Sequence, residues 1–340
     1  MPETERKSTR KWRFPPELGT FLTLLGVYLL FVLLCRYKGE AAFVSFVNLK
    51  GIMGHTVIVG IGALGMTLII ISGSIDLSAG SVIALVTCVM GVTLRRWGDT
   101  DPGLSLPLLA ALGGILAGGL CGLANGVLVS RLRLIPFIAT LGMMQVARGV
   151  AKWLGGNQTI VTPPNWFQKM MYLEPGRISP ALRWLVFSPG VWLTVLLLVA
   201  VHVLLRYTVF GRHVYAIGSN EDTARLCGVN VARTKTLVFV LGGLFLGVAG
   251  SMQYAMVGVG DPTGAFGMEL DIIAAVVIGG GSLNGGQGSA IRAILGALIT
   301  SVLRNGPTKM GRENYVQDIN VGLVNVGATS PDRHQGPRRQ

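Results

Sequence analysis

Long runs of apolar residues, separated by short polar stretches, make up most of this chain. A helix needs about 20 apolar residues to cross the hydrocarbon core of a bilayer, and fewer where neighbouring helices shield it. Ten runs fit this requirement: residues 18–35, 51–71, 80–94, 104–130, 134–154, 185–205, 237–256, 268–279, 289–303 and 315–328. The eighth run is short, and the tenth is interrupted by polar residues. The pattern predicts an all-α, polytopic membrane protein with about ten transmembrane helices.

Composition agrees with this class and excludes others. Hydrophobic residues make up 51% of the chain and charged residues 13%, unlike a soluble domain. The net charge of +13 is spread over termini and short loops without a basic stripe, so we expect no nucleic-acid partner. The cysteines have no metal-ligand spacing, and we expect neither a metal site nor a disulfide among them: Cys35, Cys88, Cys121 and Cys227.

The distribution of Lys and Arg predicts the orientation. Ten crossings that start in the cytoplasm return Arg131, Arg133, the loop 206–236 and the basic C-terminus to that side, as the positive-inside rule requires. We therefore expect an inner-membrane protein with both termini in the cytoplasm. Its parts are a tail over 1–17, a transmembrane domain over 18–306, and an atypical last helix with a basic tail over 307–340. The external loop 155–184 suits either a plug or docking rim, or a plain exposed loop.

An internal repeat links two parts of the chain. Residues 74–83 read SIDLSAGSVI and residues 282–291, 208 positions later, read SLNGGQGSAI, with four identities. Six predicted crossings separate the copies, so both face the same side. This favours two parallel five-helix repeats with broken half-helices near the centre. Chance similarity between two glycine-rich junctions is the alternative.

Polar residues inside the apolar runs are candidates for a translocation path, because polar groups in lipid are costly unless they face a cavity or a partner. Asp76 fits this role, or it caps the helix that begins near Ser78, and the two roles are compatible. Arg148 and His202 could instead extend to the membrane surface. The predicted path residues are Ser74, Asp76, Asn125, Gln145, Glu269, Asp271 and Asn284.

The loop 206–236 is the longest internal polar stretch between apolar runs, and it predicts a short helix over 220–227. Ser219 and Asp222 have capping-box spacing, and Gly228 supplies a left-handed stop. One helix face, with small residues that allow close approach, is expected to contact a soluble partner. The alternative is a solvated connector. The residues assigned to this contact are Asn220, Glu221, Asp222, Thr223, Ala224, Arg225 and Gly228.

Known catalytic patterns are missing from the sequence. It contains no GxxxxGK[ST] phosphate loop and no HExxH motif, and only four histidines. We therefore expect neither enzymatic activity nor a cofactor. Energy for transport would come from an ion gradient or from an ATPase on another chain.

Four stretches resemble the permease subunit of bacterial ribose-type and xylose-type sugar ABC importers: GMTLIIISGSIDLSAGSV, IPFIATLGMMQVARG, FGRHVYAIGSNEDTARLCGVNVARTK and ELDIIAAVVIGGGSLNGG. The likeness covers about residues 63–306. It implies a homodimeric pore, a cytoplasmic ATP-binding subunit and a periplasmic sugar-binding protein. The family's coupling helix reads Glu-Ala-Ala, three residues, then Gly, and Asp222, Thr223, Ala224 and Gly228 occupy these places.

Two departures from the family stand out. The last run carries Asp318, Asn320 and Asn325, which raise the cost of insertion, and Arg292 lies just inside the ninth run. The main hypothesis is a monosaccharide importer of ribose or xylose type. The alternatives are a gradient-driven carrier that uses Asp76, Glu269 or Asp271 as an ion site, and an ABC permease for another small polar solute. An integral-membrane enzyme lacks a catalytic constellation.

Overall fold

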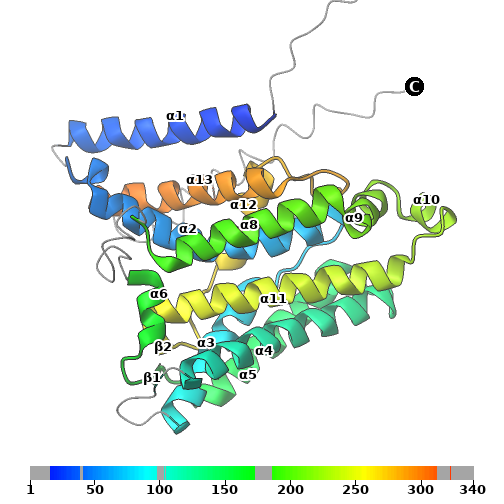
Figure 1. Cartoon of the computed structure of the whole chain (residues 1–340), viewed down its shortest axis with the longest axis horizontal. Helices are drawn as coiled ribbons and strands as arrows, with labels where there is room; N and C mark the ends of the chain where they lie inside the picture. The colour runs from blue at the N-terminus through cyan, green and yellow to red at the C-terminus, as the bar shows by residue number, and fades with distance from the viewer. Residues whose placement is uncertain are drawn as a thin grey trace, which may run out of the picture.

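Long helices lie side by side along the longest axis of the molecule (Figure 1). This computed structural model describes residues 16–38, 41–97, 103, 105–172, 186–311 and 322. One end of the bundle carries the short helices α9 and α10, and the opposite end carries the strands β1 and β2 (Figure 1). We call these the α10 end and the β1 end.

The N-terminal half consists of helices: α1 (Pro16–Tyr37), η1 (Ala41–Val44), α2 (Phe46–Ile71), α3 (Ala79–Trp97), α4 (Ser105–Ser130) and α5 (Pro136–Gly155). The strand β1 (Ile160–Val161) and the short helices η2 (Trp166–Gln168) and α6 (Lys169–Tyr172) follow. The second half contains α8 (Pro189–Tyr207), α9 (Val209–Ser219), α10 (Glu221–Leu226), α11 (Val231–Val257), β2 (Val259–Gly260), α12 (Met268–Ile278) and α13 (Ala290–Lys309).

Six of the described helices are long and apolar enough to cross a membrane: α1, α2, α3, α4, α8 and α11. The prediction of an all-α, multi-pass membrane protein is confirmed. Helices α5, α12 and α13 coincide with three further predicted runs, but ten crossings remain a prediction. The run over 315–328 lies outside the described residues apart from position 322. The parallel five-helix repeats are likewise not established by the architecture alone.

Helix α2 forms the centre of the bundle. Its N-cap Ser45 accepts a hydrogen bond from the backbone N–H of Asn48, which fixes the start of the helix. From Thr56 to Ile71 every residue is buried. Helices α8, α11, α12 and α13 pack around it, so α2 is apolar on all sides rather than along one stripe.

Helices α4 and α11 approach each other through glycines. A Cβ atom on Gly118 would lie 2.5 Å from the carbonyl oxygen of Gly243, and one on Gly122 would lie 2.2 Å from that of Phe239. Only hydrogen fits at these positions, so the backbones themselves are in contact. Small residues at such spacing are typical of closely packed helices in membrane proteins.

Helix α1 lies at the edge of the bundle against α13 (Figure 1). Phe31 fits over Gly306 of α13 and is buried together with Phe43 and Ile299. The leucines on the remaining faces of α1 are exposed, with Leu33 66% exposed. In a bilayer these faces meet lipid.

The β1 end is closed by packed short elements. β1 pairs antiparallel with β2, with Ile160 opposite Gly260. Ile160, Phe167 and Met171 are buried, and the hydroxyl groups of Thr162 and Tyr254 are 2.5 Å apart. In the described part of the loop predicted over 155–184, these residues pack on the bundle, whereas residues 156–159 are exposed, so the choice between a docking rim and a plain exposed loop stays a prediction. Residues 173–185 lie outside the described part.

Candidate functional site

The junction between α2 and α3 is buried and hydrogen-bonded. Gly73 takes a φ of +75°, which reverses the chain after α2. The Asp76 Oδ1 atom accepts hydrogen bonds from the backbone N–H of Ser78 at 2.8 Å and from its hydroxyl at 2.5 Å. The Asn125 amide of α4 donates to that hydroxyl at 3.2 Å. Asp76 is 1% exposed, so it forms the predicted Asx turn inside the protein just before α3.

The junction between α12 and α13 has a different character. Its glycines Gly280, Gly285 and Gly286 have φ values of +81°, +88° and +73°. The predicted path residue Asn284 is exposed. Its backbone N–H donates a hydrogen bond to the Ser282 hydroxyl at 3.3 Å. Glycine conformations, not a buried carboxylate, shape this turn.

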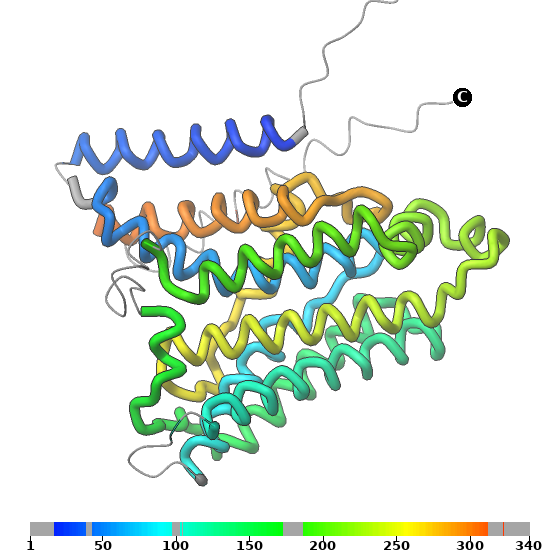
Figure 2. The backbone as a smooth tube through the Cα atoms, viewed as in Figure 1, coloured from blue at the N-terminus to red at the C-terminus, as the bar shows by residue number. Residues whose placement is uncertain are grey.

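The two junctions touch each other beside α9. The Gly286 N–H donates to the carbonyl of Ile71, the last residue of α2, at 2.9 Å. A Cβ atom on Gly218 of α9 would lie 1.7 Å from that same carbonyl oxygen. The Tyr215 hydroxyl of α9 also donates to the Gly288 carbonyl at 2.9 Å. Figure 2 lets the reader follow both junctions to the green turn of α8 and α9. Helix α9 is therefore bonded to the second junction and packed on the first.

A polar cavity of about 270 Å³ lies between α3, α5 and the start of α12. Gln145 and Glu269, both predicted path residues, line it together with Ser81, Arg148 and Lys152. Arg148 is fixed by its Nη1 atom, which donates to the carbonyls of Pro262 at 3.0 Å and Gly264 at 2.7 Å. We call this space the path cavity.

Glu269 differs from the other buried acids. Its Oε2 atom is buried and makes no hydrogen bond with any described residue. The atom lies against Gly80 in the first turn of α3, where a Cβ atom would come within 2.1 Å of it. The helix N-terminus favours the carboxylate charge, and the Glu269 side chain lines the path cavity, where a carboxylate can accept hydrogen bonds from a polar solute.

The remaining path residues lie elsewhere. Asp271 pairs with Arg304 of α13 at 2.7 Å and is 1% exposed, so it joins α12 to α13 outside the path cavity. Ser74 and Asn125 are buried at the first junction. The seven predicted residues therefore do not form one site. Ser81 and Lys152 line the cavity but were missed, although the repeat pairs Ser81 with Ser289 and so offered a signal.

Helix α10 matches the predicted short helix, with one correction at its start. The N-cap is Asn220, whose Oδ1 atom accepts from the Thr223 N–H at 2.8 Å, while Ser219 ends α9. The Asn220 side chain at this position reaches the first turn directly. Gly228 has a φ of +84°, and the Val229 N–H bonds back to the Ala224 carbonyl at 3.1 Å, so the predicted left-handed stop is confirmed.

The orientation of α10 corrects the predicted contact face. Ala224 is 4% exposed and packs with Ile217 and Val231 of the flanking helices. Glu221 pairs with Arg225 at 3.0 Å and with Lys235 at 2.6 Å. The face that contains Ala224 therefore packs on the protein itself, because burying these apolar side chains is more favourable than exposing them.

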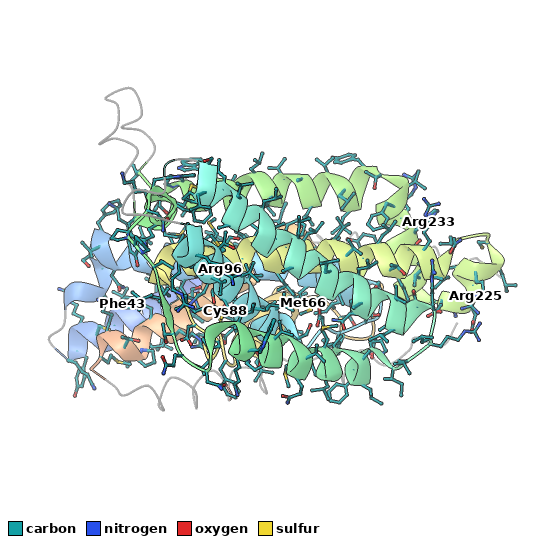
Figure 3. All side chains as sticks on the ribbon, turned by 90° about the horizontal axis from the view of Figure 1, so that it is seen from below. Phe43, Met66, Cys88, Arg96, Arg225 and Arg233 are labelled. Atoms are coloured by element: carbon teal, nitrogen blue, oxygen red, sulfur yellow. The ribbon has the colours of Figure 1, made fainter. Side chains whose placement is uncertain are left out.

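The outward face of α10 presents other residues. Asp222 and Thr223 are exposed, and Leu226 is 89% exposed. Beside α10, a groove of about 560 Å³ runs to the α4–α5 turn, lined by Arg133, Leu134 and others. In Figure 3, Arg225 and Arg233 lie at the end of the molecule opposite Phe43. This end offers a rigid, capped helix with one apolar side chain outside the core.

Comparisons with known proteins agree with the described architecture. Residues 48–328 match the family described as branched-chain amino acid transport system / permease component. The match includes the segment 315–328. No solved structure matches the chain.

Several curated permeases are similar over most of their length. A fructose import permease protein of Rhizobium meliloti is 35% identical over 86% of this chain and 79% of its own. A ribose import permease protein of Bacillus subtilis (strain 168) is 33% identical over 97% of both chains. An L-arabinose transport system permease protein of Escherichia coli (strain K12) is 33% identical over 86% of this chain and 84% of its own. The chain belongs to the branched-chain amino acid transport system permease component family, among the sugar import permeases of ABC transporters.

Proposed function

We propose that this chain is the permease subunit of an ABC importer that moves a monosaccharide across the inner membrane, driven by ATP hydrolysis on a separate subunit. The proposal rests on the named relatives and on one observation in the structure, the Glu269 side chain that lines the path cavity beside Gln145 and Arg148. Sugars bind through hydroxyl groups that donate to carboxylates and accept from amide and guanidinium groups. Glu269 from α12 and Gln145 and Arg148 from α5 supply these partners in the cavity lining.

A gradient-driven carrier needs an acidic residue that binds and releases an ion. Two of its three candidate acids already have partners inside the protein: Asp76 accepts two hydrogen bonds, and Asp271 pairs with Arg304. Glu269 is the remaining candidate. Uptake into proteoliposomes with a fixed ATP supply for the ATPase subunit separates the two functions. We expect uptake to persist when an uncoupler removes the ion gradient, and a collapse would favour the carrier.

Glu269→Gln tests the cavity itself. The amide keeps one acceptor oxygen but loses the charge, so we expect the apparent affinity for the sugar to fall about tenfold, since a hydrogen bond to a charged group contributes about 1.5–3 kcal/mol. The protein should still accumulate in the membrane. The control is Glu17→Gln on α1, which removes a carboxylate far along the chain from the path cavity. Equal sugar affinity for Glu269→Gln and the native chain would remove the cavity from the path.

Helix α10 is the proposed docking element for the ATP-binding subunit. Asp222, Thr223 and Leu226 lie on the outward face of this capped helix, and Leu226 is 89% exposed. An exposed aliphatic side chain on a rigid element can act as an anchor in a partner's pocket. Leu226→Asp should abolish co-purification of the ATPase subunit and uptake. Arg233→Gln is the matched control, because it lowers the charge of the same end by one without changing this face. Retention of the ATPase by Leu226→Asp would exclude this docking site.

We propose that the α10 end lies in the cytoplasm, together with both termini. The distribution of basic residues does not decide which end is cytoplasmic, because the β1 end also carries Arg95, Arg96 and Lys152 in the last turns of α3 and α5. Cys227, beside α10, is exposed, whereas Cys35 and Cys88 are buried. A membrane-impermeant maleimide should therefore label Cys227 in inverted vesicles but not in right-side-out vesicles. The opposite labelling pattern would invert the proposed topology.

The resemblance also implies a second copy of the chain and a periplasmic sugar-binding protein as partners. The rim formed by β1, β2, η2 and α6 is the proposed docking surface for the binding protein, because it is the ordered surface at the opposite end from α10. Crosslinking of the full complex through single cysteines on this rim, with α10 positions as controls, tests the assignment. Crosslinks only from the α10 end would contradict it.

A further inference from the structure

A second polar cavity, of about 560 Å³, lies near the α10 end between α1, α8, α9 and the start of α13. This volume is within the range of small-molecule sites in proteins. Three arginines line it, from three different helices: Arg206, Arg212 and Arg292. His202, Tyr207, Tyr215 and Ser289 also line it, and Glu17 contributes the one carboxylate. We call it the basic cavity.

The arginine on α13 is the residue that the sugar permease pattern does not explain. Arg292 lies in the first turn of α13, with its Nη1 atom beside Gly280 of the second junction. Its Nε atom is buried and makes no hydrogen bond with any described residue. Arg292, Arg206 and Arg212 form no ion pair with a described residue, although Glu17 lines the same cavity. The cavity therefore holds an excess of positive charge.

The start of α13 adds further hydrogen-bond donors. Its N-cap residue Ser289 lines the cavity but makes no side-chain capping hydrogen bond. The first backbone N–H groups of the helix consequently lack a side-chain partner, and the helix dipole favours an anion there. Arginine forks and helix N-terminal N–H groups together are the usual partners of phosphate oxygens.

The surroundings indicate where the phosphate comes from. α1 and α8 are membrane-spanning helices, and the cavity lies at their α10 ends, beside the 68% exposed ring of Tyr207. Tyrosines gather at the level of lipid head groups, and basic pockets between helices on the cytoplasmic side suit anionic head groups. We infer that the basic cavity binds a phosphate group, supplied by an anionic phospholipid of the cytoplasmic leaflet. The leaflet assignment rests on the proposed function, whereas the phosphate site does not.

Such a ligand would act on the coupling region. Arg206 and Arg212 flank the start of α9, and Arg292 and Ser289 belong to the second junction and α13. Tyr215 already joins α9 to Gly288 by a hydrogen bond of 2.9 Å. A phosphate between these groups adds charge-assisted bonds across the same contact, and so holds α9 against the second junction. A bound anionic lipid thus stabilises the packing of α9, the helix that directly precedes α10.

Native mass spectrometry of the purified full chain tests the site without transport or the ATPase subunit, so failure here leaves the proposed function untouched. Phosphatidylglycerol and phosphatidylcholine are titrated separately. We expect phosphatidylglycerol to bind more tightly. Arg292→Gln should weaken it about fivefold and the double variant Arg206→Gln/Arg212→Gln about 25-fold, from the contribution of each basic residue near an anionic membrane.

Two further variants serve as controls, one that removes a positive charge and one that removes a negative charge. Arg131→Gln removes one positive charge from the α4–α5 turn outside the cavity and should leave lipid binding unchanged. Glu17→Gln removes the opposing carboxylate and should tighten it. Arg206 and Arg212 are exposed, so the double variant that replaces them tests the site even if Arg292→Gln folds poorly. Phosphatidylglycerol affinity in the double variant equal to that of Arg131→Gln overturns the inference.

A second arm separates the two sources of phosphate. Labelled inorganic phosphate is equilibrated with the chain in detergent without lipid. Weak binding that phosphatidylglycerol displaces supports the lipid. Phosphate binding that depends on Arg292, with no preference for phosphatidylglycerol over phosphatidylcholine, overturns the lipid as the source and leaves a site for a soluble anion.

Discussion

The two junctions of the bundle have similar sequences but are held together in different ways. The first, over 72–78, is buried and stabilised by the Asp76 carboxylate and the Ser78 side chain. The second, over 279–289, is partly exposed and depends on glycines with positive φ. A buried hydrogen-bond network rigidifies the backbone around it, whereas glycine turns leave it adaptable. Similar sequence patterns therefore serve one fixed and one more adaptable support.

The contact with α9 makes this difference relevant to transport. Ile71, at the end of α2, accepts a hydrogen bond from Gly286 and lies against Gly218. Movement of α9 would therefore be resisted by the first junction and followed by the second. Four substitutions test this difference between the two junctions.

Gly218→Ala should have the largest effect. The added methyl group would lie 1.7 Å from the Ile71 carbonyl oxygen and 2.5 Å from the Gly286 nitrogen, so α9 has to separate from both junctions. Overpacking a fitted contact costs about 1–3 kcal/mol, and backbone atoms cannot rotate away. Thermal unfolding in detergent should show the loss, together with abolished uptake.

The control for this substitution is Gly142→Ala in α5, where nothing lies within 4 Å of the added atom. Alanine is a better helix former than glycine by about 0.5–1 kcal/mol, so this variant should be neutral or more stable. Equal behaviour of the two variants would show that α9 does not press on the junctions.

Asp76→Ala should have the next largest effect, because it deletes the cap of the first junction. Loss of a cap, including the donors on Ser78 that it leaves unpaired, costs about 0.5–2 kcal/mol. Asp76→Asn keeps the acceptor oxygen and should be nearly silent in denaturant unfolding and uptake. If Asp76→Asn accumulates normally but does not transport, the charge itself is used and the capping role is incomplete.

Tyr215→Phe removes only the bond between α9 and the second junction. We expect a destabilisation of about 0.5–1.5 kcal/mol, the usual contribution of one hydrogen bond. Hydrogen exchange of the α9 amides should rise more than that of α2. Tyr37→Phe is the control, because Tyr37 is 93% exposed. Uniform exchange changes in α9 and α2 would argue against a local role.

Asn284→Ala should have the smallest effect, within about 0.5 kcal/mol, because the side chain is exposed and makes no hydrogen bond that shapes the turn. Urea unfolding of this variant beside Asp76→Ala compares the two junctions at repeat-matched positions. A loss as large as that of Asp76→Ala would mean that both junctions are held in the same way.

Helix positions were largely predictable from the sequence, because apolar runs must form helices in lipid. The run 104–130 became Ser105–Ser130, and the run 268–279 became Met268–Ile278. The orientation of α10 was not predictable, since the burial of Ala224 depends on Ile217 and Val231 from two other helices. The same holds for Asp271, whose partner Arg304 lies on the next helix and gives no local signal.

The place of α1 has a consequence for biosynthesis. Its packing partner Gly306 lies in α13, so about 270 residues must be added after α1 before Gly306 can meet Phe31. At about 5–20 residues per second, this takes roughly 13–54 s. During that time α1 stays in the bilayer with lipid as its neighbour, which its exposed leucines permit. Helix α1 is therefore made early but is among the last of the described helices to reach its packing partner.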